Sequence, residues 1–175
     1  MATKAEVAAW SDRIYNAARN GTPRNREGLP VVLSGLLVAQ ARHETGEFSS
    51  NHFLQSNNAF GYSYFPSSDW QIGSGGLADN GLRVAKYASI EDSTREIVDW
   101  IFRRVAEGKF PKDLSSIGTP EQYAQLLKDS NYYGDTVKNY AAGLRRFFTD
   151  LPAFPFGVLF IGGLLFWLIY YKKLN

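Results

Sequence analysis

Residues 30–47 read PVVLSGLLVAQARHETGE and form the least polar helical stretch among residues 1–150. Pro30 suits the first turn of a helix, and Gly46 is a residue type that ends one. No breaker stands between them, so the stretch predicts one continuous helix, the second along the chain.

The segments on either side predict four more helices and one hairpin. Apolar residues recur with near-helical spacing over 5–18, and capping patterns at Ser89 and Thr119 open two later helices. Asp-Asn-Gly at 79–81, between short apolar segments, predicts a hairpin turn, and the rest of 51–80 is expected to form loops. The expected helices span residues 5–18, 30–46, 90–108, 120–130 and 136–149. The predicted fold class is therefore mainly α with a small β-hairpin insertion.

Residues 151–171 read LPAFPFGVLFIGGLLFWLIYY and contain no charged residue. About 20 mainly apolar residues suffice to cross a bilayer, and Asp150 and Lys172 bracket the stretch. The sequence predicts one domain over 1–150 and a single C-terminal transmembrane helix with a short basic tail over 151–175. The expected protein is thus anchored in a bacterial or virion membrane, with the lipid bilayer as partner of 151–171. The N-terminus lacks the apolar core of a secretory signal.

The composition excludes several classes of chemistry. There is no cysteine, so a disulfide, a thiolate nucleophile and a cysteine zinc site are excluded. The net charge of +2 does not indicate nucleic-acid binding. His43 and Glu44 begin a zinc-protease-like string, but Glu47 stands where the second histidine is required, so neither a metal nor a cofactor is expected.

Glu44 is the strongest candidate for a chemical role. On a helical wheel it shares the apolar stripe with Leu37 and Gln40, whereas Arg42 falls on the opposite, outward side. Burial and the negative end of the helix dipole both disfavour its ionised form, which predicts a raised pKa. A carboxylic acid that stays protonated near neutral pH is what a glycosidase needs to protonate a leaving oxygen. The alternative is a solvated glutamate at a frayed helix end.

The strings AQARHETGEF (39–48) and QSNNAFGYSYF (55–65) resemble the catalytic region of the glycoside hydrolase family 73 peptidoglycan glucosaminidases, and the resemblance extends over residues 5–149. It implies a lysozyme-like α+β fold with Glu44 as the catalytic acid. Residues 121–144 are similar to the closing pair of helices in that family, in which a tyrosine beside the cleft helps to hold the substrate. Tyr132 is the first candidate for that tyrosine and Tyr133 the second.

Four more residues are candidates for substrate binding. Asn57 and Asn58 lie in a loop that the resemblance places at the floor of the cleft, where they either position an N-acetyl group or close a turn. Tyr62 and Trp70 either stack on sugar rings or pack in the core.

Many family members carry a second acidic residue in the hairpin, and here Asp79 is the only candidate, at a turn that also favours aspartate for structural reasons. Without a second acid, the substrate's acetamido group or its C6 hydroxyl can act as internal nucleophile, the latter as in lytic transglycosylases. The resemblance implies an endo-β-N-acetylglucosaminidase acting on peptidoglycan strands. A muramidase, a lytic transglycosylase and a non-catalytic glycan-binding or structural membrane protein are the alternatives. A phage entry enzyme, with other virion or membrane proteins as partners, is a further hypothesis.

Overall fold

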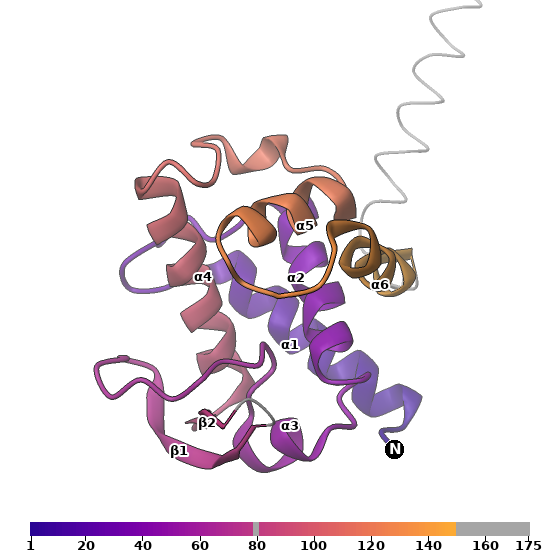
Figure 1. The fold of residues 1–175 in the computed structure, drawn as a ribbon, viewed down its shortest axis with the longest axis vertical. Helices are drawn as coiled ribbons and strands as arrows, with labels where there is room; N and C mark the ends of the chain where they lie inside the picture. Colours follow the sequence, from indigo (N-terminus) through magenta and orange to yellow (C-terminus); the bar gives the residue numbers. More distant parts are fainter. Residues whose placement is uncertain (79–80, 150–175) are drawn as a thin grey trace, which may run out of the picture.

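The computed structural model describes residues 1–78 and 81–149. In chain order the elements are α1 (Lys4–Asn20), α2 (Val31–Glu44), α3 (Asn51–Ser56), β1 (Gln71–Leu77), β2 (Arg83–Tyr87), α4 (Ile90–Ala106), the 3-10 helix η1 (Leu114–Ser116), α5 (Pro120–Asp129) and α6 (Val137–Thr149). Figure 1 shows α3 and the hairpin at one end of the molecule, α5 and α6 at the other, and α1, α2 and α4 between them. The predicted class, mainly helical with a small hairpin, is confirmed.

The centre of the fold is α2, which packs against α1 on one side and α6 on another. Leu33, Leu36 and Leu37 are completely buried, as the low polarity of the stretch predicts. The helix ends where the Thr45 hydroxyl donates to the Ala41 carbonyl at 2.6 Å and accepts from the Phe48 amide at 2.8 Å. This closure turns the chain sharply just after Glu44.

The capping patterns act as predicted. Ser89 accepts a hydrogen bond from the Asp92 amide at the start of α4, and Thr119 forms a reciprocal capping box with Gln122 at the start of α5. The antiparallel hairpin of β1 and β2 is also confirmed, with Ala78 donating to the Leu82 carbonyl at 2.8 Å.

The α-helix α3 was not predicted, because residues 51–56 were expected to be a loop. Six residues are too few to show a helical period. Ser50 caps α3 by accepting from the Phe53 amide, and the buried Phe53 ring packs edge-on against Trp10 with centroids 5.1 Å apart. Contacts with α1 therefore support a helix too short to be stable alone.

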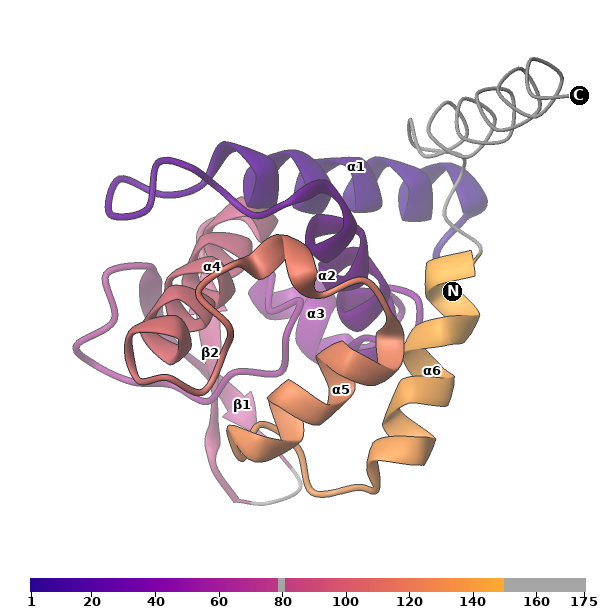
Figure 2. The ribbon, with the colours of Figure 1, turned by 90° about the horizontal axis from the view of Figure 1, so that it is seen from above.

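The prediction that Arg42 faces outward is wrong. Its exposed fraction is 7%, because α6 covers that side of α2 (Figure 2). The guanidinium lies 4.8 Å from the centre of the Phe147 ring and donates to Glu47 Oε1 at 2.7 Å. A helical wheel shows which residues share one side of a helix, but it does not show which sides another helix covers in the fold.

Within residues 1–78 and 81–149, no helix is long and apolar enough to cross a membrane. The predicted anchor at 151–171 lies outside the described residues, together with Asp150 and Lys172.

Candidate active site

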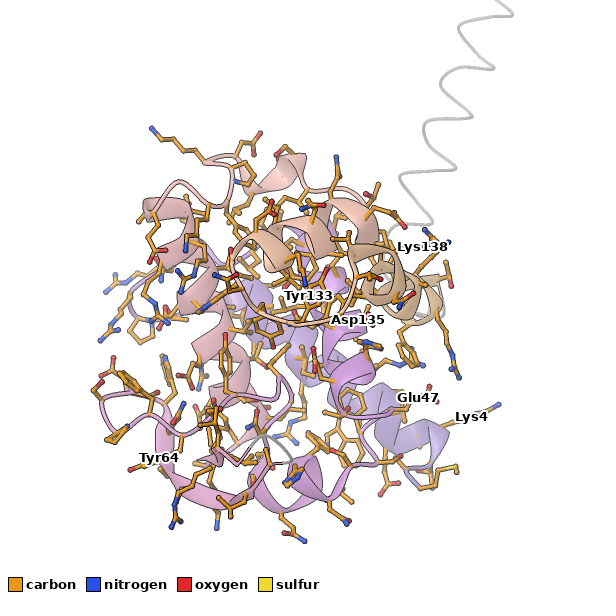
Figure 3. All side chains as sticks on the ribbon, viewed as in Figure 1. Lys4, Glu47, Tyr64, Tyr133, Asp135 and Lys138 are labelled. Carbon is orange, nitrogen blue, oxygen red and sulfur yellow. The ribbon has the colours of Figure 1, made fainter. Side chains whose placement is uncertain are left out.

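Glu44 lies in a cleft of about 470 Å³ between the two ends of the molecule. The cleft is lined by the end of α2, by residues 60–63, by Trp100 and Arg104 of α4, and by residues 130–133. The 130–135 segment crosses in front of the end of α2, and it carries Tyr133 and Asp135 (Figure 3). Two segments distant in the sequence thus form opposite walls around one carboxylate.

The Glu44 side chain is open to solvent on its cleft side but held by protein elsewhere. Its Oε1 accepts from the Tyr140 hydroxyl at 2.5 Å. A side chain at Gly61 would begin 3.7 Å from Oε2, so the glycine leaves this oxygen uncovered. Desolvation by the surrounding protein raises the pKa of Glu44, and the Tyr140 hydrogen bond opposes part of this rise. The direction of this pKa shift agrees with the one predicted from the sequence, whereas the role of Glu44 as the catalytic acid stays a prediction.

Tyr140 is the residue that the sequence reasoning missed. It lies on α6, 96 positions from Glu44, and only 4% of it is exposed. Burial raises its pKa strongly, so the hydroxyl keeps its proton and acts as a donor. Its position on the apolar stripe of α6 predicts a core residue, and nothing in the sequence pairs it with Glu44.

Tyr133 supports Tyr140 from the cleft side. The two rings are stacked with centroids 3.8 Å apart and planes 7° from parallel. The Tyr133 hydroxyl donates to the Ala124 carbonyl at 3.0 Å and not to Glu44. Tyr133 therefore lines the cleft and fixes the ring that holds the carboxylate.

Tyr132 lies in the cleft but does not hydrogen-bond to Glu44. Its hydroxyl donates to the Phe60 carbonyl at 2.5 Å, which ties the two walls together. Its ring meets the rings of Trp100 and Tyr62 edge-on, at 5.5 Å and 6.1 Å between centroids. The three rings form an aromatic wall beside Glu44.

Asn57 and Asn58 do not line the cleft. Asn57, with a left-handed φ of 52°, donates to the Tyr87 carbonyl at 3.1 Å. Asn58 is buried, donates to the Tyr62 and Ala85 carbonyls, and accepts from the Tyr62 amide. Both amides brace the 57–62 loop against β2, which is the turn-closing alternative of the sequence analysis.

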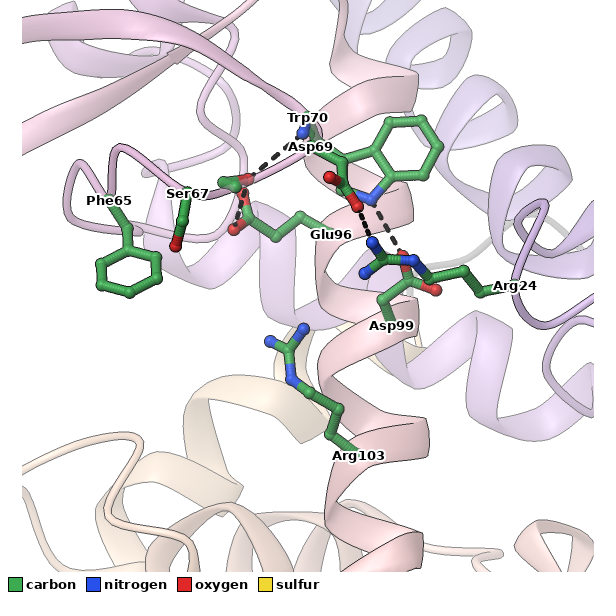
Figure 4. A pocket seen from close by; sticks show the side chains of 9 residues that line it. Arg24, Phe65, Ser67, Asp69, Trp70, Glu96, Asp99 and Arg103 are labelled. Atoms are coloured by element: carbon green, nitrogen blue, oxygen red, sulfur yellow. Dashed lines mark hydrogen bonds and ion pairs between the residues drawn. The ribbon is translucent and has the colours of Figure 1, made fainter.

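Trp70 lies outside this cleft, in a second pocket on the neighbouring face of α4, which carries Glu96, Asp99 and Arg103 (Figure 4). Asp79 lies outside the described residues, so its position relative to Glu44 is not described. Among the described residues that line the cleft, Glu44 is the only carboxylate.

His43 packs behind the Glu44–Tyr140 pair. Its ring meets the Tyr140 ring edge-on at 5.1 Å, and a Cβ on Gly143 would lie 2.5 Å from His43 Cε1. Burial lowers the pKa of His43, and the charge of Asp135 acts in the opposite direction. The absence of a side chain at Gly143 lets α6 approach α2 closely at this point.

Comparisons with known proteins identify the family and the fold of this chain. A family model described as mannosyl-glycoprotein endo-β-N-acetylglucosaminidase matches residues 27–151. A chain of a type VI secretion system effector-immunity complex from Pseudomonas protegens is 17% identical with a TM-score of 0.58, covering 83% of this chain and 93% of that chain. The glycoside hydrolase domain of FlgJ from Salmonella typhimurium is 20% identical with a TM-score of 0.54, covering 85% and 99%. A peptidoglycan hydrolase from Sphingomonas sp. A1 is 19% identical with a TM-score of 0.53, covering 84% and 96%. No curated protein matches the chain.

Proposed function

This chain belongs to the mannosyl-glycoprotein endo-β-N-acetylglucosaminidase family and is a glycosidase, and from that premise we propose that it cleaves the β-1,4 glycan strand of bacterial peptidoglycan as an endo-β-N-acetylglucosaminidase. The family membership confirms the resemblance that was based on residues 39–48, around Glu44, and on residues 55–65. Two solved structures of the same fold are the glycoside hydrolase domain of FlgJ and a peptidoglycan hydrolase, which supports this choice of substrate. The observation that carries the proposal is the raised pKa of Glu44 in an open cleft.

Glu44 acts as the general acid. Its proton passes to the glycosidic oxygen as the bond from that oxygen to C1 of N-acetylglucosamine breaks, and the leaving sugar departs with a free hydroxyl. The raised pKa keeps a larger fraction of Glu44 protonated near neutral pH than an ordinary glutamate would have. The donated hydrogen bond from Tyr140 fixes Oε1, so Oε2, next to Gly61, is the oxygen free to carry the proton.

The substrate's own acetamido group serves as the nucleophile. Its carbonyl oxygen attacks C1 as the leaving group departs, and the Glu44 carboxylate then takes a proton from the water that replaces it at C1. This route needs only one protein carboxylate, which fits the described cleft lining, where Glu44 is the only one. It predicts retention of configuration at C1. A second acid acting on water directly, with Asp79 as the candidate, predicts inversion.

The aromatic wall of Tyr62, Trp100 and Tyr132 supports the sugar rings. Aromatic faces and edges give extensive contact area without demanding a charged ligand. Arg104 stacks over Trp100 with its guanidinium carbon 5.0 Å from the ring centre, and its charge is paired with Glu107.

The test is mass spectrometry of soluble fragments released from purified peptidoglycan by the full chain, with Glu44→Gln as control. Reducing N-acetylglucosamine ends, lost in the variant, are expected. Reducing muramic acid ends would indicate a muramidase, and anhydromuramic ends a lytic transglycosylase. Release of no fragment by folded protein would contradict the proposal and favour a glycan-binding or structural role. Proton NMR of the first-formed anomer separates retention from inversion.

We also propose that residues 151–171 anchor the enzyme in a bacterial or virion membrane. The support is the uncharged 21-residue composition of this segment, bracketed by Asp150 and Lys172. Sedimentation of the full chain with liposomes, and its loss after four leucine-to-lysine changes within 151–171, tests the anchor. Equal sedimentation of both proteins would argue against it.

A further inference from the structure

A second pocket of about 380 Å³ lies beside the cleft, between the 65–70 loop, Arg24 and the face of α4 that carries Glu96, Asp99 and Arg103 (Figure 4). Nothing in the proposed glycosidase reaction uses these residues. The pocket is built from α4 and from two segments that α4 holds together.

Asp99 organises one side of the pocket. Only 3% of it is exposed, and it accepts from the Thr22 hydroxyl at 2.6 Å, the Asn25 amide at 2.7 Å and Trp70 Nε1 at 2.9 Å. These bonds fix the 22–25 and 65–70 segments on α4. Trp70 therefore helps to hold the wall of the pocket in place through its bond to Asp99.

Glu96 organises the other side. It accepts from the Tyr87 hydroxyl at 2.5 Å, from Gln71 Nε2 at 3.0 Å and from the Ser68 hydroxyl at 3.1 Å. Neutral donors within the protein thus bind the oxygens of the buried Asp99 carboxylate and of the half-buried Glu96 carboxylate. The pocket is accordingly poor in free acceptors and does not suit an amine ligand.

The unused groups in the pocket are donors. The Arg103 side chain is exposed and has no hydrogen-bond or ion-pair partner among the described residues, and the same holds for the Ser67 hydroxyl. Arg24, by contrast, is paired with Asp69. A guanidinium with its fork of N–H groups free favours a carboxylate. Phe65, 62% exposed, adds an apolar wall beside these donors.

The pocket adjoins the Glu44 cleft across α4 and Tyr62. Asp99 and Arg103 line the pocket, while the next residues along α4, Trp100 and Arg104, line the cleft. Tyr62 lines the cleft and lies close enough to Arg103 for this positive charge to act on its pKa. A branched ligand lying in the cleft can therefore reach Arg103 with a side branch.

We infer that this pocket is a subsite for the peptide branch of the glycan, with Arg103 binding a peptide carboxylate and Phe65 contacting its apolar side chains. The inference rests on the proposed function, because it takes the ligand in the cleft to be a peptide-bearing glycan. Arg103 is a binding residue for specificity and takes no part in bond cleavage.

The test measures binding, independently of turnover. The full chain carrying Glu44→Gln is titrated calorimetrically with a disaccharide-tetrapeptide of peptidoglycan and with the same compound after amidation of its peptide carboxyls. The amidated compound is expected to bind about tenfold more weakly, the scale of one charge-assisted hydrogen bond. Arg103→Gln should abolish this difference, and Arg103→Lys, which keeps the charge but not the fork, should retain part of it.

Lys112→Gln is the matched control, because it removes one positive charge at an exposed position that lines neither pocket. It should keep the tenfold difference. Equal affinities for the two compounds, or an undiminished difference in Arg103→Gln, would overturn the inference even if peptidoglycan is cleaved. A clear difference in a protein that releases no fragments would instead refute the proposed function and leave the carboxylate site standing.

Discussion

Tyr140→Phe is the most direct test of how the protein controls its acid. The substitution removes one hydroxyl, the donor to Glu44 Oε1 at 2.5 Å, and keeps the ring that is stacked on Tyr133. That hydrogen bond lowers the pKa of Glu44, whereas desolvation raises it. Without the hydroxyl only the raising effect remains, so the pKa of Glu44 should rise further.

The size of the rise follows from the strength of the lost bond. A hydrogen bond to a charged group contributes about 1.5–3 kcal/mol. Glu44 is open to solvent on the cleft side, where water replaces part of the lost interaction, so the lower end applies. About 1.5 kcal/mol corresponds to roughly one pKa unit.

The assay is the pH dependence of kcat/KM for peptidoglycan cleavage, whose alkaline limb reports deprotonation of the general acid in the free enzyme. In Tyr140→Phe this limb should move up by about one unit. Tyr133→Phe is the matched control, because its hydroxyl donates to the Ala124 carbonyl and its limb should stay in place. An alkaline limb that does not move in Tyr140→Phe, or moves to lower pH, would refute the assignment of the Tyr140–Glu44 bond as a control on the acid.

Three further predictions concern stability and packing. Gly143→Ala should lower stability by about 1–3 kcal/mol in urea unfolding, because its Cβ would lie 2.5 Å from His43 Cε1; unchanged stability would show that the ring moves freely. Asp99→Ala should cost about 3 kcal/mol, because it leaves one buried and two half-buried donors without their acceptor; a loss below about 1 kcal/mol would contradict the bracing role. The raised pKa of Glu44 means that folding disfavours its ionised form, so the stability of wild type relative to Glu44→Gln should be greatest below the ordinary glutamate pKa and should fall as pH rises through the folded-state pKa. Urea unfolding of both proteins from pH 4 to pH 8 should show this trend. A stability difference that is constant, or that widens in favour of wild type as pH rises, would be inconsistent with it.

Features that depend on neighbouring residues in the chain were predictable. Ser89 and Thr119 cap their helices because the side chain bonds to an amide three positions on, a contact that needs no other element. The hairpin follows from a turn between two short strands. Glu44 could be singled out because its place at the end of an apolar helix is a property of residues 30–47 alone.

Features that depend on which elements meet were not predictable. Arg42 is buried because α6 packs on it, and Tyr140 reaches Glu44 because α6 returns to the end of α2. The sequence offered several tyrosines for the cleft, and only the packing shows that Tyr132 ties the walls while Tyr140 holds the acid.

The sequence by itself determined the helix that carries the acid, the caps that begin its neighbours and the family to which the chain belongs, because these depend on local hydrogen bonds and on the order of residue types. Only the tertiary structure decided which hydroxyl meets Glu44, that Asn57 and Asn58 brace a loop, and that Trp70 stands in a second pocket with Asp99. Those contacts join residues from 27 to 96 positions apart, and side chains that far apart along the chain meet only when the elements between them have packed.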